Sequence, residues 1–199
     1  YELQGQPDSI AIAPDRKRAA IVIESQRDED LNDGLLPQYP SGGLLIVDLK
    51  GSANSWTITS ADLSRVATNA VDGSDLEPEF VDINDSNEAV VTFQENNHIA
   101  VVDMRTGKTL NEFSAGSATL HNVDTEEEDL INLNSELTKR REPDGVTWVD
   151  RDLFVTANEG DYTDAQDEEG GSRGFTVFKQ NGTVVYDSAE SFEHLLVSA

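Results

Sequence analysis

A proline flanked by polar residues recurs three times in this chain, each time in front of a β-rich run. The segments are "QPDSIAIAPDRKRAAIVIE" from Gln6, "EPEFVDINDSNEAVVTFQE" from Glu77 and "EPDGVTWVDRDLFVTANE" from Glu142. The prolines are 71 and 65 residues apart, and a glutamate follows each one after 17, 17 and 16 residues. Within each segment, two β-rich runs separated by a polar turn predict a β-hairpin.

A second predicted hairpin follows the first in every repeat: "GLLIVDLKGSANSWTIT", "HIAVVDMRTGKTLNEF" and "GFTVFKQNGTVVYDS". Four strands per unit, repeated in tandem without a clear helical pattern, are typical of β-propeller blades. We therefore predict an all-β chain with about three four-stranded blades. Blade one is expected over residues 6–60, blade two over 77–114 and blade three over 142–189.

Three blades do not close a ring, because propellers usually have about four to eight. Residues 1–199 are therefore predicted to form a partial propeller within a larger ring of about six to eight blades. The remaining blades would come from the same parent protein or from a cleaved second chain.

The net charge restricts the partners of the chain. With 39 acidic and 14 basic residues the formal charge is −25, which repels nucleic acid and anionic membranes and attracts cations. No apolar run approaches the roughly 18 residues needed to cross a bilayer, and the absence of cysteine excludes thiolate metal sites. We expect divalent cations as partners, with no nucleic acid, no direct membrane insertion and no organic cofactor.

The acidic residues are concentrated in the segments predicted to lie on one face. In a propeller, the long segments 25–43, 60–76, 114–141 and 159–173 share a face with the blade entries. Counted with its flanking residues, this face comprises residues 2–8, 24–43, 60–79, 94–97, 114–144 and 158–173, which hold 27 of the 39 acids. A salt-adapted surface is the alternative explanation, but it would spread the charge more evenly. Long loops on one face of a rigid scaffold often carry function.

The blade entries provide the first candidate site. Residues two apart on an extended strand point to the same side, so the pairs Gln6/Asp8, Glu77/Glu79 and Glu142/Asp144 are expected to surround the mouth of the central channel. Hard oxygen ligands in this number suit Ca²⁺. The candidate metal ligands are Glu24, Glu77, Glu79, Glu95, Glu142, Asp144, Glu159 and Asp161. The alternative is that these carboxylates accept backbone hydrogen bonds and tie the blades together.

Two further motifs bear on function. "KRR" at 139–141 lies beside the third entry, and Arg140 or Arg141 could bind phosphate; the alternative is that the run neutralises adjacent acids. "GGSRG" at 170–174 matches the pattern of a nucleophile elbow but precedes a strand, so we reject it as a catalytic serine motif.

The segments "EPEFVDINDSNEAVVTFQENNHIAVVD", "REPDGVTWV" and "FVTANEGDYTDAQDEEGGSRGFTVF" resemble the choice-of-anchor I domain. That family is a secreted propeller related to the esterase-like-activity-of-phytase group. Some members are labelled alkaline-phosphatase-like, and others resemble mesenchyme-specific cell-surface glycoproteins. The resemblance implies a secreted, cell-surface or periplasmic location and further blades after the matched part.

Two functions are consistent with these observations. The first is an extracellular or cell-surface calcium-binding propeller acting as a binding, adhesion or matrix module, with extracellular matrix components as partners. The alternative is a metal-dependent phosphoesterase, alkaline-phosphatase-like or phytase-like, acting on phosphate esters. Whether the chain is an enzyme stays open at this point. An arginine directed into the channel would favour catalysis, and a channel filled by hydrogen bonds between blades would favour the module.

Overall fold

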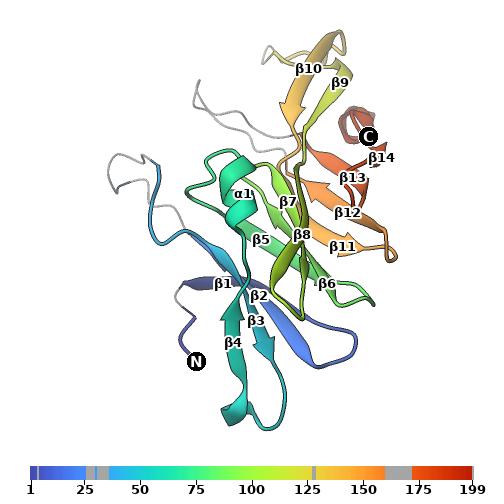
Figure 1. The fold of residues 1–199 in the computed structure, drawn as a ribbon. Coiled ribbons are helices and arrows are strands. Elements are labelled where there is room, and N and C mark those ends of the chain that lie inside the picture. Colours follow the sequence, from blue (N-terminus) through green and yellow to red (C-terminus); the bar gives the residue numbers. More distant parts are fainter. Residues whose placement is uncertain (4, 26–29, 31–35, 127–128, 160–171, 199) are drawn as a thin grey trace.

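Three four-stranded antiparallel sheets follow one another along the chain (Figure 1). The computed structural model describes residues 1–3, 5–25, 30, 36–126, 129–159 and 172–198. In every four-stranded sheet the spatial order of the strands equals their order in the sequence. The prediction of an all-β chain built from successive propeller blades is confirmed.

The strand bounds define the blades. Blade one contains β1 (Gln6–Ile12), β2 (Arg18–Glu24), β3 (Gly43–Asp48) and β4 (Thr57–Ser60). Blade two contains β5 (Pro78–Ile83), β6 (Glu88–Phe93), β7 (His98–Asp103) and β8 (Lys108–Ser114). Blade three contains β11 (Pro143–Trp148), β12 (Leu153–Asn158), β13 (Gly174–Lys179) and β14 (Val184–Asp187).

The first strand of each blade lies next to the first strand of its neighbour. Strand β5 contacts β1 on one side and β11 on the other, so the blade entries meet in the middle of the molecule (Figure 1). Alternation along the strands supplies apolar side chains to both faces of blade two. Val91 and Phe93 of β6 belong to the core shared with blade one, whereas Val90 belongs to the core shared with blade three.

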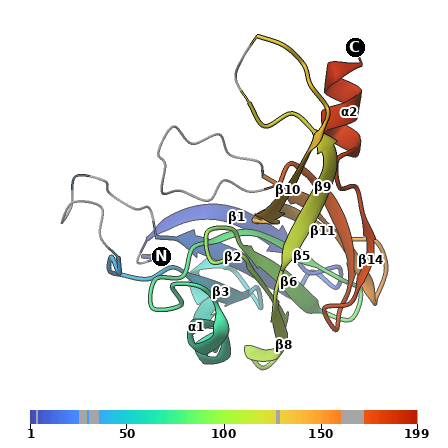
Figure 2. The same cartoon turned by 90° about the horizontal axis from the view of Figure 1, so that it is seen from above.

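A two-stranded ribbon interrupts the segment between blades two and three, which was expected to be a loop. Strands β9 (Ser117–Val123) and β10 (Ser135–Arg140) pair antiparallel and project away from the blades (Figure 2). Ala118, Leu120 and Val123 form a small cluster with Leu137, so the ribbon has an apolar face of its own. This cluster explains why the segment is ordered as strands.

The structure also contains short helices that the sequence pattern did not predict. They are α1 (Ser64–Asn69), α2 (Ser191–Val197) and the 3₁₀ turn Ala53–Ser55. Helix α1 buries only Val66, and α2 packs Phe192 edge-on against Phe175 with 6.1 Å between the ring centroids. Both are too short to show a helical repeat in the sequence. No helix in the described part of the chain is long and apolar enough to cross a bilayer.

Candidate cation-binding site

The three entry strands share a β-bulge directly after their prolines. In each blade the pairing register shifts between the proline and the third residue after it. A bulge re-aims the side chains within it, and the residues there are Asp8, Glu79 and Asp144. The strict alternation on which the paired-carboxylate prediction depended therefore does not hold at the entries.

Glu79 lies at the centre of the acidic residues. Burial raises the pKa of the Glu79 carboxyl to about 8, and repulsion from Glu95, Glu24, Asp8 and Asp144 adds to this shift. These four carboxylates come from all three blades. Their effect on one half-buried side chain shows that the blade entries bring their charges together.

Asp144 of blade three is also affected by carboxylates of its own blade and of blade one. Burial raises the pKa of the Asp144 carboxyl, and Glu159 and Asp8 contribute through repulsion. Among the described residues, no three acidic or histidine side chains converge tightly enough to hold a metal ion by themselves. The carboxylates are thus close enough to act on one another electrostatically.

Two glutamines orient the carboxylates at the ends of the second strands. Gln6 Nε2 donates a hydrogen bond to Glu24 Oε2 at 3.1 Å within blade one. Gln94 Nε2 donates to Glu159 Oε2, which links blade two to blade three. Each glutamine thus binds one carboxylate oxygen of its partner.

The sequence spacing missed the role of Gln94. Each of Glu24, Gln94 and Glu159 follows the residue that pairs with, or lies opposite, the entry proline. Glu95 was chosen because it lies as far from its proline as Glu24 does, but the first turn of blade one is one residue longer than the others. Glu95 still acts on Glu79 more strongly than any other charge.

Asn96 and Asn97 hold the entries of two blades. Asn96 Oδ1 accepts from the backbone N–H of Glu77 at 2.8 Å, and Asn97 Oδ1 accepts from that of Glu142 at 3.1 Å. The Asn97 side chain also donates to the carbonyl oxygen of Gly116 at 3.1 Å. Glu77 is only 5% exposed. The prediction that Glu77 and Glu142 bind a cation is not tested by these contacts and stays a prediction.

Direct bonds between blades two and three fix the position of the third entry. The carboxylate Oδ2 of Asp82 accepts from Thr147 Oγ1 at 2.9 Å and from the backbone N–H of Trp148 at 2.7 Å. The Thr92 hydroxyl donates to the carbonyl oxygen of Asp144 at 2.6 Å. These hydrogen bonds join blade two directly to the entry strand of blade three.

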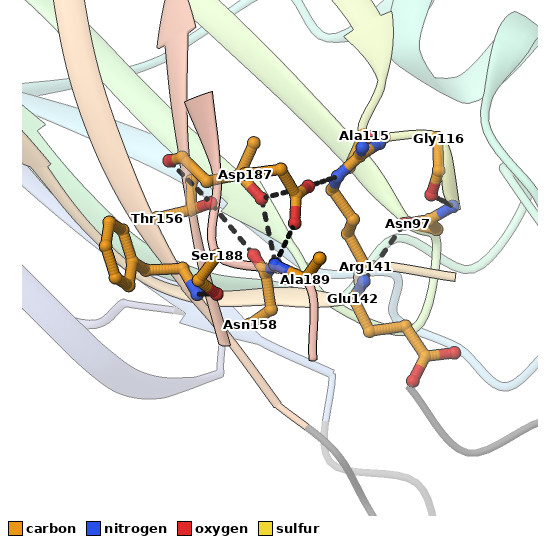
Figure 3. A network of polar contacts seen from close by, with 12 residues as sticks. Asn97, Ala115, Gly116, Arg141, Glu142, Thr156, Asn158, Asp187, Ser188 and Ala189 are labelled. Atoms are coloured by element: carbon orange, nitrogen blue, oxygen red, sulfur yellow. Dashed lines mark hydrogen bonds and ion pairs between the residues drawn. The ribbon is translucent and has the colours of Figure 1, made fainter. Parts of the chain in front are cut away.

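The arginine predicted as a phosphate ligand has other partners. Arg141 Nε donates to Asp187 Oδ2 at 2.7 Å and Nη1 donates to the carbonyl oxygen of Ala115 at 2.6 Å (Figure 3). The carbonyl oxygen of Arg140 accepts from Ser172 N–H at 2.8 Å. Phosphate binding by these arginines stays a prediction, and Asp161 lies outside the described residues.

The fold and the entries define a class: a β-propeller chain whose blades present carboxylates where their first strands begin. The family model of the choice-of-anchor I domain matches residues 1–170, and the chain belongs to that family. The resemblance seen in the sequence is thereby confirmed.

Solved structures give more distant likenesses. Hydrazine synthase from Kuenenia stuttgartiensis matches 94% of this chain at 16% identity with a TM-score of 0.40, and this chain covers 49% of the synthase chain. The β-propeller domain of Cps50 (Swd1) from Myceliophteria thermophila matches 90% at 9% identity with a TM-score of 0.31, with 71% of that domain covered. A comparison with curated proteins finds no match.

Proposed function

We propose that this propeller binds Ca²⁺ at the carboxylates of its blade entries and acts outside the cell or at its surface as a binding, adhesion or matrix module. The observation that carries the proposal is the meeting of carboxylates from three blades around the half-buried Glu79. Like charges held together in a partly desolvated place destabilise one another, and a cation between them removes that cost. The set is Asp8, Glu24, Glu79, Glu95, Asp144 and Glu159.

Calcium fits this arrangement better than magnesium. Ca²⁺ takes about six to eight oxygen ligands with loose geometry and accepts water among them, whereas Mg²⁺ demands a near-ideal octahedron. Carboxylates from three blades that act on one another supply several such oxygen ligands. Choice-of-anchor domains are typically surface-anchored or secreted, and millimolar-range calcium modules are common outside cells.

Calorimetric titration of the purified protein with Ca²⁺ and with Mg²⁺ tests the proposal. We expect Ca²⁺ to bind more tightly, and Glu79→Gln to weaken Ca²⁺ binding by about tenfold or more because it removes the central carboxylate, which loses its proton when a cation binds. Asp85→Asn is the matched control, since Asp85 is an exposed acid in the β5–β6 turn of the same blade, away from the entries. Equal affinity of all three proteins, or no binding heat with the unmodified one, would contradict the proposal.

The phosphoesterase alternative requires a cationic group beside the metal to bind phosphate. Arg141 is bound to Asp187 and to the carbonyl oxygen of Ala115, which supports the binding module over the enzyme. The alternative is checked by hydrolysis of p-nitrophenyl phosphate with and without EDTA. Turnover that disappears with the chelator would put the phosphoesterase first.

A further inference from the structure

Blade three contains a chain of buried polar side chains in a position where blade two is apolar. Thr156 Oγ1 donates to Asn158 Oδ1 at 3.0 Å, and Asn158 Nδ2 donates to Thr176 Oγ1 at 2.9 Å. Thr176 Oγ1 then donates to Asp187 Oδ2 at 3.1 Å (Figure 3). Buried polar groups are retained only when they are satisfied, so this continuous series of bonds requires a reason.

The series ends on a carboxylate that is fixed from three directions. Asp187 Oδ2 accepts from Thr176 and from Arg141, and Oδ1 accepts from the backbone N–H of Ala189 at 2.8 Å. Charge-assisted bonds of this kind are short and directional. Asp187 therefore has one orientation, and it presents Oδ2 to the Arg141 guanidinium.

Arg141 connects the fixed Asp187 carboxylate to the blade entry. Its side chain is only 11% exposed and reaches the carbonyl oxygen of Ala115, while its backbone N–H donates to the carbonyl oxygen of Gly116 at 3.1 Å. Asn97 binds the same Gly116 carbonyl and the backbone N–H of Glu142. The carbonyl oxygens of Ala115 and Gly116 thus hold Arg141 through its side chain and its backbone, and the Asn97 side chain holds the backbone N–H of Glu142.

The entry of blade three needs this support more than the other two. Glu142 has φ +46°, a left-handed conformation that a glutamate rarely adopts, whereas neither Gln6 nor Glu77 at the equivalent positions has a positive φ. Such a conformation persists only where its surroundings determine it. In Figure 3 the Glu142 carboxylate points away from the Arg141 guanidinium, so the arginine holds the backbone and not the acid.

We propose that Arg141 is a positioning residue, which Asp187 and the Asn158–Thr176 bonds hold in place, and that it sets the entry turn from which Asp144 joins the carboxylates of the other blades. This inference rests on the proposed cation binding. It gives the buried polar series a function, because rigid outer partners of metal-binding groups commonly determine affinity.

The test uses Asp187→Asn, which keeps the shape of the side chain and removes its charge. Ca²⁺ affinity is measured by calorimetry at a temperature where circular dichroism shows each protein folded, and thermal melting is recorded in parallel. We expect Asp187→Asn to weaken Ca²⁺ binding by about tenfold. The control is Glu193→Gln, which breaks the exposed pair of Arg173 and Glu193 in the same part of the chain and leaves the entry intact.

The two proposals fail in different ways. If the unmodified protein does not bind Ca²⁺, the proposed function falls and this inference falls with it. If the unmodified protein binds and Asp187→Asn binds equally well, even with a lowered melting temperature, Arg141 has a purely structural role and only the inference is overturned. If Asp187→Asn does not fold, Thr176→Val serves as the test. This variant leaves the Arg141–Asp187 pair in place and removes one hydrogen bond to the carboxylate. A loss of Ca²⁺ affinity then supports the inference, and unchanged affinity overturns it.

Discussion

Blades two and three have the same strand order and register, but the corresponding face of their second strands is apolar in blade two and polar in blade three. Strand β6 places Val91 and Phe93 against blade one, and both are fully buried. The residues at the same register in β12 are Thr156 and Asn158, which are also buried but bound to one another. One repeat pattern therefore supports both an apolar core and a hydrogen-bonded one.

The difference shows what each blade contributes. Blade two lies between two neighbours, and burial of apolar area stabilises both of its interfaces. Blade three gives up part of that stabilisation, because buried polar groups bring little net stability even when satisfied. Its buried Asn158 and Thr176 instead orient Asp187, which in turn orients Arg141. The comparison separates a blade that mainly holds the fold from one that also shapes the site.

The largest expected effect is in blade two. Phe93→Ala removes a fully buried ring from the core shared with blade one and should lower the free energy of unfolding by about 3–5 kcal/mol. Equilibrium urea unfolding of the purified protein measures the loss. The control is Phe80→Ala in the neighbouring strand, where the ring is 41% exposed and the cost should be less than half as large. Equal costs would mean that the apolar core of blade two is not its main source of stability.

A smaller effect is expected in blade three, and it should be non-additive. Asn158→Leu leaves the Thr156 and Thr176 hydroxyls without the amide and should cost about 1–3 kcal/mol. Thr156→Val alone should cost less, because the hydroxyl has only Asn158 and a long contact to the Thr176 carbonyl. The double variant imitates blade two, and it should cost no more than Asn158→Leu by itself.

A double-mutant cycle from urea unfolding gives the coupling between Asn158 and Thr156. Strictly additive costs would show that the two side chains do not act as one unit. In that case the polar series would be a set of independent bonds and the contrast with blade two would lose its meaning.

The sequence predicts the blades well because the signals that define them are local. Alternating apolar residues and short polar turns specify each hairpin, and the proline spacing shows that the hairpins repeat. The ribbon β9–β10 escaped prediction because residues 124–134 separate its two strands, a longer connection than the short loops of about two to five residues that mark a hairpin in a sequence. Its apolar face consists of a few residues, such as Leu120 and Leu137, which come together only when the two strands pair.

The sequence could indicate the residue types of the candidate site but not its geometry, and cation binding by these residues stays a prediction. The acids after the prolines do converge, as their mutual effect on Glu79 and Asp144 shows. The bulges that re-aim them leave no mark in the spacing of residues. The role of Asn97 depends on a contact with Glu142, 45 residues away, which a single sequence does not reveal.

The smallest expected effect compares the entry carboxylates of the two blades through pH. The pKa of Glu79 rises from 4.5 to about 8 on folding, so the folded protein keeps a proton that the unfolded chain has lost within this range. Stability from this group is therefore present below about pH 4.5 and falls as the pH rises to about 8. Glu79→Gln should remove the decline and stabilise the protein at pH 9 by about 1 kcal/mol, well below the unscreened value because Glu79 keeps contact with water.

Asp144→Asn should give a smaller gain, since two carboxylates repel Asp144 whereas four repel Glu79. Urea midpoints from pH 4 to 9 in calcium-free buffer measure both variants against the unmodified protein. Parallel profiles for all three would show that the entries do not concentrate charge, and saturating Ca²⁺ should bring the profiles together if the entries bind it.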